Sequence, residues 1–333
     1  MATTTMPAEA ITIDDIQAAR ERLKPVAVVT PLLENPFINE LAGRRVLVKA
    51  ECLQRTGSFK FRGGWSALSH LSDAEKKRGV IAYSSGNHAQ AIALSAQLLG
   101  VKASIIMPND APELKLANTR AYGAEVILYD RPGGENREEI GARLSEKHGL
   151  TLIKPYDHPQ VIAGQGTCGL ELAEQAQAMG VTQAEVLVCC GGGGLTSGTA
   201  LACEHLAEHF TVRPVEPESS DDVCRSLISG QREVNTVQST SICDAIVTPS
   251  PGELTFPILK RLCGAGLSVS DKEAMQAVKT VMLRLKLIAE PGGAVALAAA
   301  LNQQNQIQTD TVICVISGGN IDPAVMMQCL HDS

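Results

Sequence analysis

The sequence predicts an α/β protein whose sheets are open, twisted and mostly parallel. Three observations support this fold class. Apolar segments alternate with helix-like segments between residues 80 and 153, the alternation resumes after residue 160, and clusters of Ser, Asn and Gly directly follow several predicted strands. Such alternation favours a parallel sheet, because each helix returns the chain to the end of the sheet where the next strand begins.

Capping boxes mark the first predicted helices. Thr12 and Asp15 frame the start of a helix near residue 14, and Ser72 and Glu75 frame a second start. Gly79 supplies the stop for that second helix, because glycine tolerates the left-handed backbone that ends many helices. Between the two helices, residues 46–49 have the apolar character of a strand.

Residues 80–153 contain four predicted strands separated by helices. We expect one compact unit, with a parallel sheet and helices on both of its faces. The predicted strands are 80–85, 101–108, 125–129 and 151–153, and the predicted helices are 87–99, 112–122 and 135–147.

The second half of the chain also alternates between helices and strands. Residues 230–257 interrupt the pattern, because they are rich in Ser, Thr and Pro. We expect this segment to be a long functional loop with one short strand. The remaining predicted elements are helices 161–179 and 195–209 and strands 185–190, 212–215 and 311–317.

The composition excludes two classes of function. The formal net charge is −7 and aromatic residues make up 3% of the 333 residues, which argues against the basic surfaces and stacking platforms of nucleic-acid-binding proteins. The longest apolar runs are shorter than the roughly 18 residues that a membrane span needs. We therefore expect a globular protein that binds neither nucleic acid nor a membrane.

Cysteine usage favours a reducing compartment. The ten cysteines form no CxxC pair, and several lie in strand-like runs, where a thiol serves as a small apolar group. No basic segment followed by an apolar stretch opens the chain, so we expect no secretory signal. Both observations predict a cytoplasmic protein.

A lysine lies in a glycine-rich segment that leads from a predicted strand into a helix. Lys60 follows Ser58 and Phe59, with glycines at 57, 63 and 64. A desolvated, neutral lysine amine can form a Schiff base with an aldehyde cofactor. The alternative is an ordinary solvated lysine, since most lysines lie on the surface.

Small polar residues follow the predicted strand 80–85 and open a helix, as Ser84-Ser85-Gly86-Asn87-His88. Ligands collect at the carboxyl ends of parallel strands, and the amino terminus of a helix offers free N–H groups to a carboxylate. A plain helix cap explains the same residues equally well.

Four consecutive glycines, Gly191, Gly192, Gly193 and Gly194, lie between a predicted strand and a helix. Residues without Cβ let the backbone N–H groups close around a phosphate, assisted by the helix dipole. The spacing differs from a dinucleotide fingerprint, and no GKS or GKT follows. Ser317-Gly318-Gly319-Asn320 brings a further hydroxyl to the end of the last strand, with an ordinary helix cap as the alternative.

Together and in this order, the motifs resemble those of fold-type II pyridoxal-phosphate enzymes. The likeness is to the branch of serine racemases and serine/threonine dehydratases, including 3-hydroxyaspartate dehydratases. It implies two open twisted, mostly parallel sheets flanked by helices, with a large domain of residues 1–72 and 154–333 and an inserted small domain of residues 73–153. The stretches Thr30-Pro31, Ile162-Ala163-Gly164-Gln165-Gly166-Thr167 and Glu290-Pro291 also match this branch.

The resemblance implies roles for the cofactor-binding residues. Lys60 would carry pyridoxal phosphate as a Schiff base and take the Cα proton of the substrate, with Phe59 against the cofactor ring. Asn87 would bind the 3-hydroxyl of the cofactor, and Ser317 would face the pyridine nitrogen. The phosphate would be held by Gly191, Gly192, Gly193 and Gly194.

The resemblance also implies a substrate site. Ser84, Ser85, Gly86, Asn87 and His88 would surround the substrate carboxylate, and Ser85 matches the serine that handles the proton on the opposite face in racemases. Arg137 falls where the racemase-like branch has an arginine facing the substrate, and a guanidinium suits a second carboxylate. An exposed helix residue in an i,i+4 pairing pattern is the competing interpretation of Arg137.

An acidic segment resembles the divalent-metal loop of the racemases. By that likeness Glu216, the carbonyl of Ser220 and Asp222 would bind Mg²⁺, or Ca²⁺ or Mn²⁺, and oxygen ligands suit Mg²⁺ and Ca²⁺. A solvated acidic surface loop is the alternative.

The implied activity is that of a dehydratase, or ammonia-lyase. It would convert L-serine, L-threonine or 3-hydroxyaspartate to a 2-oxo acid and ammonia by α,β-elimination. The alternative is an amino-acid racemase of the serine or aspartate type. We expect a homodimer, because dimers are the commonest assembly, and no regulatory domain after residue 333. Asp244-Ala245 departs from the usual Asp-Gly of relatives, and Tyr156 replaces an Asn or Phe.

Overall fold

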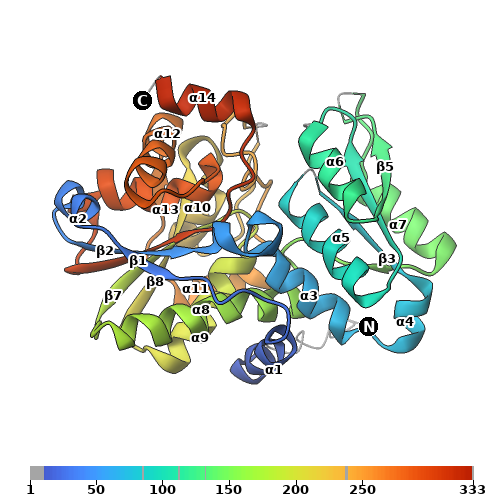
Figure 1. Cartoon of the computed structure of the whole chain (residues 1–333), viewed down its shortest axis with the longest axis horizontal. Coiled ribbons are helices and arrows are strands. Elements are labelled where there is room, and N and C mark those ends of the chain that lie inside the picture. The colour runs from blue at the N-terminus through green and yellow to red at the C-terminus, as the bar shows by residue number, and fades with distance from the viewer. Residues whose placement is uncertain (1–10, 85, 112, 132, 237–238, 332–333) are drawn as a thin grey trace.

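The chain folds into two β-sheets that lie in separate bodies, with the helix α3 (Lys60–His70) between them (Figure 1). The computed structural model describes residues 11–84, 86–111, 113–131, 133–236 and 239–331. The strands of the six-stranded sheet, in spatial order, are β1 (Leu32–Glu34), β2 (Arg45–Ala50), β10 (Thr311–Ile316), β7 (Ala184–Cys189), β8 (Phe210–Pro217) and β9 (Leu267–Val269).

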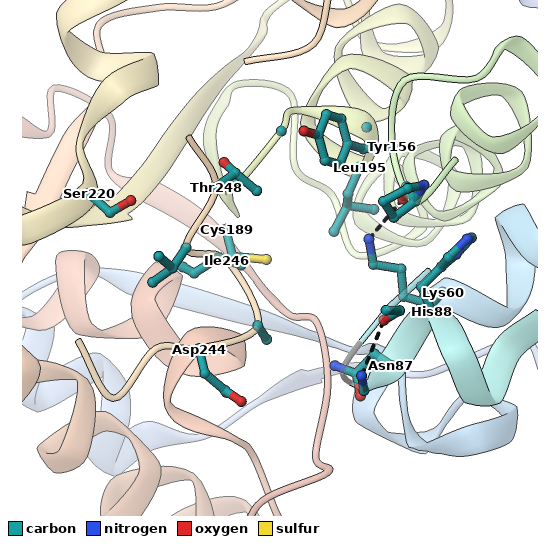
Figure 2. Close-up of a pocket in the computed structure, with 18 of the residues that line it drawn as sticks. Lys60, Asn87, His88, Tyr156, Cys189, Leu195, Ser220, Asp244, Ile246 and Thr248 are labelled. Carbon is teal, nitrogen blue, oxygen red and sulfur yellow. Dashed lines mark hydrogen bonds between the residues drawn. The ribbon is translucent and has the colours of Figure 1, made fainter. Parts of the chain in front are cut away.

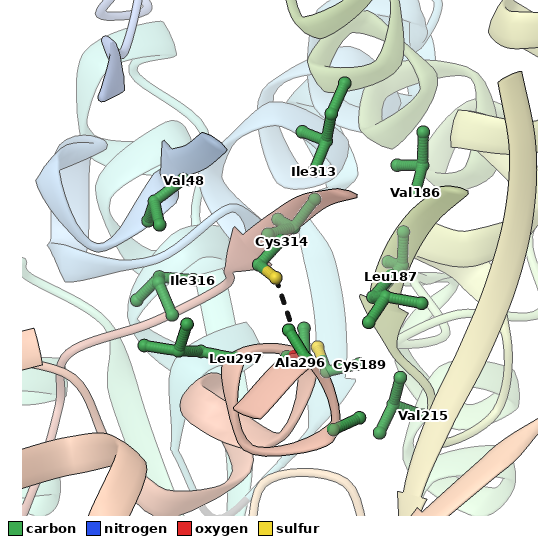
Figure 3. Close-up of a cluster of buried hydrophobic side chains, with 14 of the residues drawn as sticks. Val48, Val186, Leu187, Cys189, Val215, Ala296, Leu297, Ile313, Cys314 and Ile316 are labelled. Carbon is green, nitrogen blue, oxygen red and sulfur yellow. Dashed lines mark hydrogen bonds between the residues drawn. The ribbon is translucent and has the colours of Figure 1, made fainter. Parts of the chain in front are cut away.

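Five strands of this sheet run parallel, and only the edge strand β1 is antiparallel to its neighbour. The central strands are buried along nearly their whole length, so they are apolar on both faces. Figure 3 shows Leu187 and Ile316 of two neighbouring strands on the same side as Leu297 of α13 (Pro291–Asn302), whereas Val186 and Ile313 point to the other face of the sheet. This double-sided burial explains why the strands read as continuous apolar runs in the sequence.

Helices cover the six-stranded sheet. Helix α13 packs on β7, β8 and β10, and α9 also packs on β7 and β8. The helices associated with this sheet are α1 (Ile13–Leu23), α2 (Pro36–Ala42), α8 (Pro159–Ala178), α9 (Gly194–Leu206), α10 (Asp222–Ser229), α11 (Thr255–Leu262), α12 (Asp271–Thr280), α13 (Pro291–Asn302) and α14 (Pro323–His331).

The four-stranded sheet is entirely parallel. Helices α5 and α6 contact its strands, as does α7, and α3 joins the two bodies by packing on both α5 and α8. In spatial order the strands are β5 (Glu125–Tyr129), β4 (Ala103–Pro108), β3 (Val80–Tyr83) and β6 (Thr151–Leu152), and the helices are α3 (Lys60–His70), α4 (Asp73–Arg78), α5 (Asn87–Leu99), α6 (Glu113–Ala121) and α7 (Arg137–His148).

A buried ionic cluster anchors α3 to the six-stranded body. The guanidinium of Arg62 on α3 is 1% exposed and donates to both oxygens of Glu51, at 2.7 and 2.8 Å, and to both oxygens of Glu171 on α8. Lys49 of β2 donates to the same Glu171 at 2.8 Å. Removing one partner from such a cluster leaves a buried charge uncompensated, which costs about 3–5 kcal/mol. The cluster therefore holds Lys60, two residues before Arg62, in a defined place.

Most predicted elements are confirmed. Both capping boxes form, around Thr12 and Ser72, and α5 and β5 have the predicted bounds. The short strand expected within residues 230–257 is wrong, since the described part of that segment contains no strand before α11 begins at Thr255. The helix expected to reach residue 209 ends at Leu206, because β8 already begins at Phe210. None of the described helices is long and apolar enough to span a membrane.

Candidate active site

A cavity of about 630 Å³ is lined by residues of both bodies. It lies where β7 and β10 and the neighbouring β3 end, as expected for ligand sites of open parallel sheets. Nearly all of the residues singled out in the sequence line it together, although they come from separate segments of the chain. These residues are Phe59, Lys60, Ser84, Gly86, Asn87, His88, Arg137, Gly191, Gly192, Gly193, Gly194, Ser220 and Ser317.

Lys60 is the first residue of α3, and the preceding turn is fastened to the end of β10. The N–H of Phe59 donates to the carbonyl of Ser317 at 3.0 Å, and Ser58 forms a β-bridge with Gly318. The Lys60 amine donates to the carbonyl of Pro155 at 3.0 Å (Figure 2). Burial of the amine lowers the pKa of Lys60 to about 8, so a usable fraction is neutral near pH 7.

The four glycines form a cradle at the amino terminus of α9. Within the described chain, no backbone N–H of Gly191, Gly192, Gly193 or Gly194 donates a hydrogen bond. A Cβ on Gly192 would lie 2.2 Å from the ring of Tyr156, and Gly193 has a left-handed φ of +93°. The loop thus requires glycine and presents free donors beside a positive helix end, which fits the phosphate of pyridoxal phosphate.

The side chain of Asn87 is held at both ends. Its Nδ2 donates to Glu290 at 2.5 Å, and its Oδ1 accepts from Asn320 at 2.7 Å. Burial raises the pKa of Glu290 to about 7, and Oε2 of Glu290 is buried without a hydrogen-bond partner in the described chain. These contacts fix the orientation of the Asn87 amide before any ligand binds.

The amino terminus of α5 faces the cavity with neutral groups. Ser84 accepts the N–H of Gly86 at 3.1 Å, which shapes the turn before the helix. Burial, followed by the neighbouring Lys60, lowers the pKa of His88 to about 3, and its Nε2 lies 3.0 Å from the carbonyl of Ile153. The His88 ring is therefore neutral, so the helix end and the hydroxyls supply the attraction for a carboxylate. Ser85 lies outside the described residues.

Arg137 is the first residue of α7 and lines the cavity. Its guanidinium is 5.3 Å from the centre of the Tyr83 ring, a cation–π distance, and it forms no ion pair within the described residues. The i,i+4 pairing considered for it is absent from the same part of the chain. The cation is therefore available to a ligand in the cavity.

Several lining residues were missed as site residues. Lys115 of α6 pairs with Asp244 at 2.9 Å across the two bodies, and Asn235 and Thr248 line the same cavity. No local pattern marks them, because they lie in an irregular segment or on a helix face. The composition of residues 230–257, rich in Ser, Thr and Pro, indicated that this segment was functional, and the likeness to relatives around Asp244-Ala245 implied that it lines the substrate side.

Two of the three residues expected to bind a metal, both acidic, do not line the cavity. Glu216 is fully buried and accepts the N–H groups of Val223 and Cys224 at 3.0 and 2.7 Å. Burial raises the pKa of Glu216 to about 8 and that of Asp222 to about 6. No group of three or more His, Cys, Asp or Glu able to hold a metal occurs in the described chain, so any cation here would need backbone or water oxygens as further ligands. The alternative of a solvated acidic loop is wrong for these two buried carboxylates.

Comparisons with known proteins are consistent with the fold and with a glycine loop that binds the phosphate of pyridoxal phosphate. Residues 23–318 match the family model of pyridoxal-phosphate dependent enzymes, and the chain belongs to this family. It is an enzyme of the branch that contains serine racemases and serine/threonine dehydratases, as the sequence motifs predicted.

Three known proteins illustrate what the chain is similar to. Serine racemase of Schizosaccharomyces pombe is 44% identical over 93% of this chain and 94% of its own length. L-threo-3-hydroxyaspartate ammonia-lyase of a Pseudomonas species is 44% identical over 92% of this chain and 95% of its own. The crystal structure of a threonine deaminase from T.th. superposes with a TM-score of 0.88 at 44% identity, covering 93% of this chain and 99% of that chain. The fold class and the family resemblance are thereby confirmed.

Proposed function

We propose that this enzyme is a dehydratase of β-hydroxy amino acids and that 3-hydroxyaspartate is its preferred substrate. The observation that carries the proposal is one cavity lined by both Lys60 and Arg137, whose guanidinium has no ion-pair partner among the described residues. In the overall reaction 3-hydroxyaspartate yields oxaloacetate and ammonia, since the water lost from Cα and Cβ is regained when the product hydrolyses. L-Threonine and L-serine would give their 2-oxo acids in the same way.

Different residues of this chain bind the cofactor and move the proton. Bound pyridoxal phosphate supplies an electron-withdrawing ring that weakens the Cα–H bond of the amino acid. The glycines 191–194 would hold its phosphate, Asn87 would bind the 3-hydroxyl, Ser317 would face the ring nitrogen, and Phe59 would pack against the ring. Lys60 would hold the cofactor aldehyde and, once the substrate amine has displaced it, would take the Cα proton as a free amine, a role supported by its lowered pKa of about 8.

The substrate would be oriented by its carboxylates. The amino terminus of α5, with Ser84, Gly86, Asn87 and His88, binds the α-carboxylate through N–H and hydroxyl groups. Arg137 binds the second carboxylate of a dicarboxylic substrate, which is the physical reason to rank 3-hydroxyaspartate above threonine. The 44% identity to an L-threo-3-hydroxyaspartate ammonia-lyase supports the same ranking.

The second candidate function is racemisation, and the 44% identity to a serine racemase favours it. Both reactions begin with removal of the Cα proton, and they differ in whether the β-hydroxyl leaves. In a racemase Ser85 would return the proton on the opposite face.

One assay separates the two functions. The holoenzyme is incubated with L-serine, L-threonine and the threo and erythro forms of L-3-hydroxyaspartate, and the 2-oxo acid and the D-isomer are measured separately. We expect oxo acid from L-serine, from L-threonine and from one of the two 3-hydroxyaspartate diastereomers. That diastereomer should react fastest, and the other should give no oxo acid. If no substrate gives oxo acid while D-isomer accumulates, the enzyme is a racemase and not a dehydratase.

We further propose that a divalent cation, Mg²⁺ or else Ca²⁺ or Mn²⁺, binds at Glu216, Asp222 and the carbonyl of Ser220. Support comes from Oδ2 of Asp222, which is buried and has no hydrogen-bond partner in the described chain. A cation would offset the repulsion between two buried carboxyls, whose pKa values are both raised when no cation is near.

The remaining proposals concern organisation. We propose a small domain of residues 73–153 inserted in a large domain of residues 1–72 and 154–333, consistent with a four-stranded sheet whose strands all lie between residues 80 and 152. A homodimer is proposed from the frequency of such assemblies. A cytoplasmic location is proposed because none of the ten cysteines, all within the described residues, forms a disulfide bond.

A further inference from the structure

Asn235 connects two parts of the molecule that the proposed function treats separately. Its Nδ2 is within hydrogen-bond distance of Oγ of Ser220 at 2.9 Å, Oδ1 of Asp222 at 2.6 Å and the carbonyl of Thr248 at 2.9 Å. Its backbone N–H donates to the carbonyl of Pro249 at 2.8 Å. One side chain and its own backbone therefore hold the acidic loop on one side and residues 248–249 on the other.

Residues 244–249 form one wall of the cavity. In Figure 2 the segment of chain that carries Asp244, Ile246 and Thr248 lies between Ser220 and Lys60. Within the described chain, both ends of this wall are held by residues outside it. At one end Asp244 forms an ion pair with Lys115, and at the other the carbonyls of Thr248 and Pro249 accept hydrogen bonds from Asn235. A displacement of Asn235 would therefore change the shape of the substrate cavity.

The two carboxylate oxygens of Asp222 have different surroundings. Oδ1 of Asp222 is taken by Asn235, whereas Oδ2 has no partner in the described chain. A cation that binds Oδ2 would leave the bond from Asn235 to Oδ1 in place. The Oδ1 of Asn235 accepts from Arg225 at 2.6 Å, which fixes the amide orientation so that Nδ2 faces Asp222 and Thr248.

We infer that Asn235 is a positioning residue through which a divalent cation at Glu216 and Asp222 adjusts the affinity of the cavity for substrate. The inference rests on the cation and the substrate of the proposed function. A cation orders the carboxylate of Asp222, Asp222 orders Asn235, and Asn235 orders the carbonyls of Thr248 and Pro249. Asn235 touches no group of Lys60, so the effect falls on KM more than on kcat.

The test compares the wild-type holoenzyme with Asn235→Ala. The midpoint of thermal unfolding is followed during titration with MgCl₂, with NaCl of equal ionic strength as the blank, and KM and kcat for L-threo-3-hydroxyaspartate are measured with and without Mg²⁺. In the wild type we expect Mg²⁺ to raise the midpoint and to lower KM about 5-fold or more, in the usual range of coupling between sites. In the variant Mg²⁺ should still raise the midpoint, but KM should change less than about 2-fold, because the link is cut.

Two further variants serve as a control and as a second test of the inference. Asn302→Ala removes a side-chain amide bonded to the carbonyl of Ala298, far along α13, and should keep the full response of KM to Mg²⁺. Asn235→Asp keeps the shape and the Arg225 contact but loses the Nδ2 donors, so it should lose the response even if Asn235→Ala fails to fold.

Each contrary result is distinct. A KM that responds to Mg²⁺ equally in the wild type and in both Asn235 variants overturns the inference, as does a wild type whose midpoint and KM ignore Mg²⁺. If the wild type releases no oxo acid at all, the dehydratase proposal fails. The coupling is then read from the dissociation constant of succinate, a dicarboxylate probe measured by thermal shift with and without Mg²⁺. Loss of its Mg²⁺ dependence in Asn235→Asp supports the inference, and retention overturns it.

Discussion

At the scale of residues, the site depends on charges whose state is set by burial. Lys60 has a lowered pKa because its amine is desolvated, while Arg137 brings a guanidinium group to the same cavity. His88 is buried and neutral, so it adds no positive charge to the cavity. A lysine amine that is partly neutral near pH 7 and a guanidinium group therefore line the same cavity.

The pKa of Lys60 predicts how the apoenzyme takes up its cofactor. Only the neutral amine attacks an aldehyde, and a pKa of about 8 in place of 10.5 makes roughly one amine in ten neutral at pH 7. The rate of cofactor uptake should therefore rise about tenfold per pH unit below pH 8 and level off above it. Stopped-flow absorbance of pyridoxal phosphate added to apoenzyme measures this rate.

The control for this prediction is Lys60→Ala, in which the visible band of the bound cofactor should be absent at every pH. An uptake rate that keeps rising to pH 10 would mean that the lysine titrates as in water.

Arg137 should control which substrate is preferred. Arg137→Ala removes a charge-assisted hydrogen bond to the second carboxylate, worth about 1.5–3 kcal/mol, or roughly 10- to 100-fold in kcat/KM for 3-hydroxyaspartate. The kcat/KM for L-threonine, which lacks that carboxylate, should change little. Steady-state rates of oxo-acid release with both substrates give the ratio.

Arg143→Ala is the matched control, because Arg143 is an exposed arginine on the same helix, α7, and does not line the cavity. Equal losses with both substrates in Arg137→Ala would indicate a structural role for Arg137.

At the scale of elements, the cradle depends on the contact between the glycine loop and residue 156. Gly192 passes so close to the ring of Tyr156 that no Cβ fits, and the carbonyl of Gly192 accepts from Oγ1 of Thr255 at 2.6 Å. The strand β7, the loop and the helix α9 therefore form a rigid unit with the segment 155–157, whose Pro155 carbonyl also receives the Lys60 amine.

Gly192→Ala should push Tyr156 and the loop apart and weaken cofactor binding about 5- to 150-fold, since overpacking of this kind costs about 1–3 kcal/mol. Equilibrium dialysis of pyridoxal phosphate against the apoenzyme measures the affinity. The double variant Gly192→Ala with Tyr156→Ala removes the clash and should recover most of the loss. No recovery in the double variant would show that the loop itself, rather than the contact, had failed.

At the scale of the whole molecule, the cavity is closed by contacts between the two bodies. The ion pair of Lys115 and Asp244 spans them, with Lys115 buried and Asp244 about half exposed. Both bodies also meet along α3, which the buried cluster of Arg62, Glu51 and Glu171 ties to the larger sheet. The pair at the cavity wall is the weaker of these two connections, because one partner reaches solvent.

A double-mutant cycle tests the ion pair. Lys115→Met and Asp244→Asn should each raise KM several-fold, and the double variant should resemble the single ones, because both remove the same contact, which is worth about 1 kcal/mol. KM values and unfolding midpoints are measured for all four proteins. Additive effects would mean that the two side chains act independently.

Local patterns were enough to predict much of the fold. The capping boxes at Thr12 and Ser72 and the helix Asn87–Leu99 were predicted correctly, since caps and periodicity are properties of neighbouring residues. The bounds of β7 and β8 were off by one or two residues, because burial on both faces removes the alternation that marks a strand's ends. The short strand expected in residues 230–257 was wrong, because the described part of that segment is held by side chains such as Asn235 instead of by a sheet.

Local sequence specified the chemistry of this protein: a lysine before a helix, a glycine cradle and a hydroxyl at a strand end are each short motifs, and their order along the chain identified the family. Which polar side chains face one another followed from tertiary packing alone. Glu290 with Asn87, Lys115 with Asp244 and Asn235 with Asp222 are separated by 203, 129 and 13 residues. Such pairs are chosen by packing between elements, and the free energy of that packing leaves no periodic trace in the sequence.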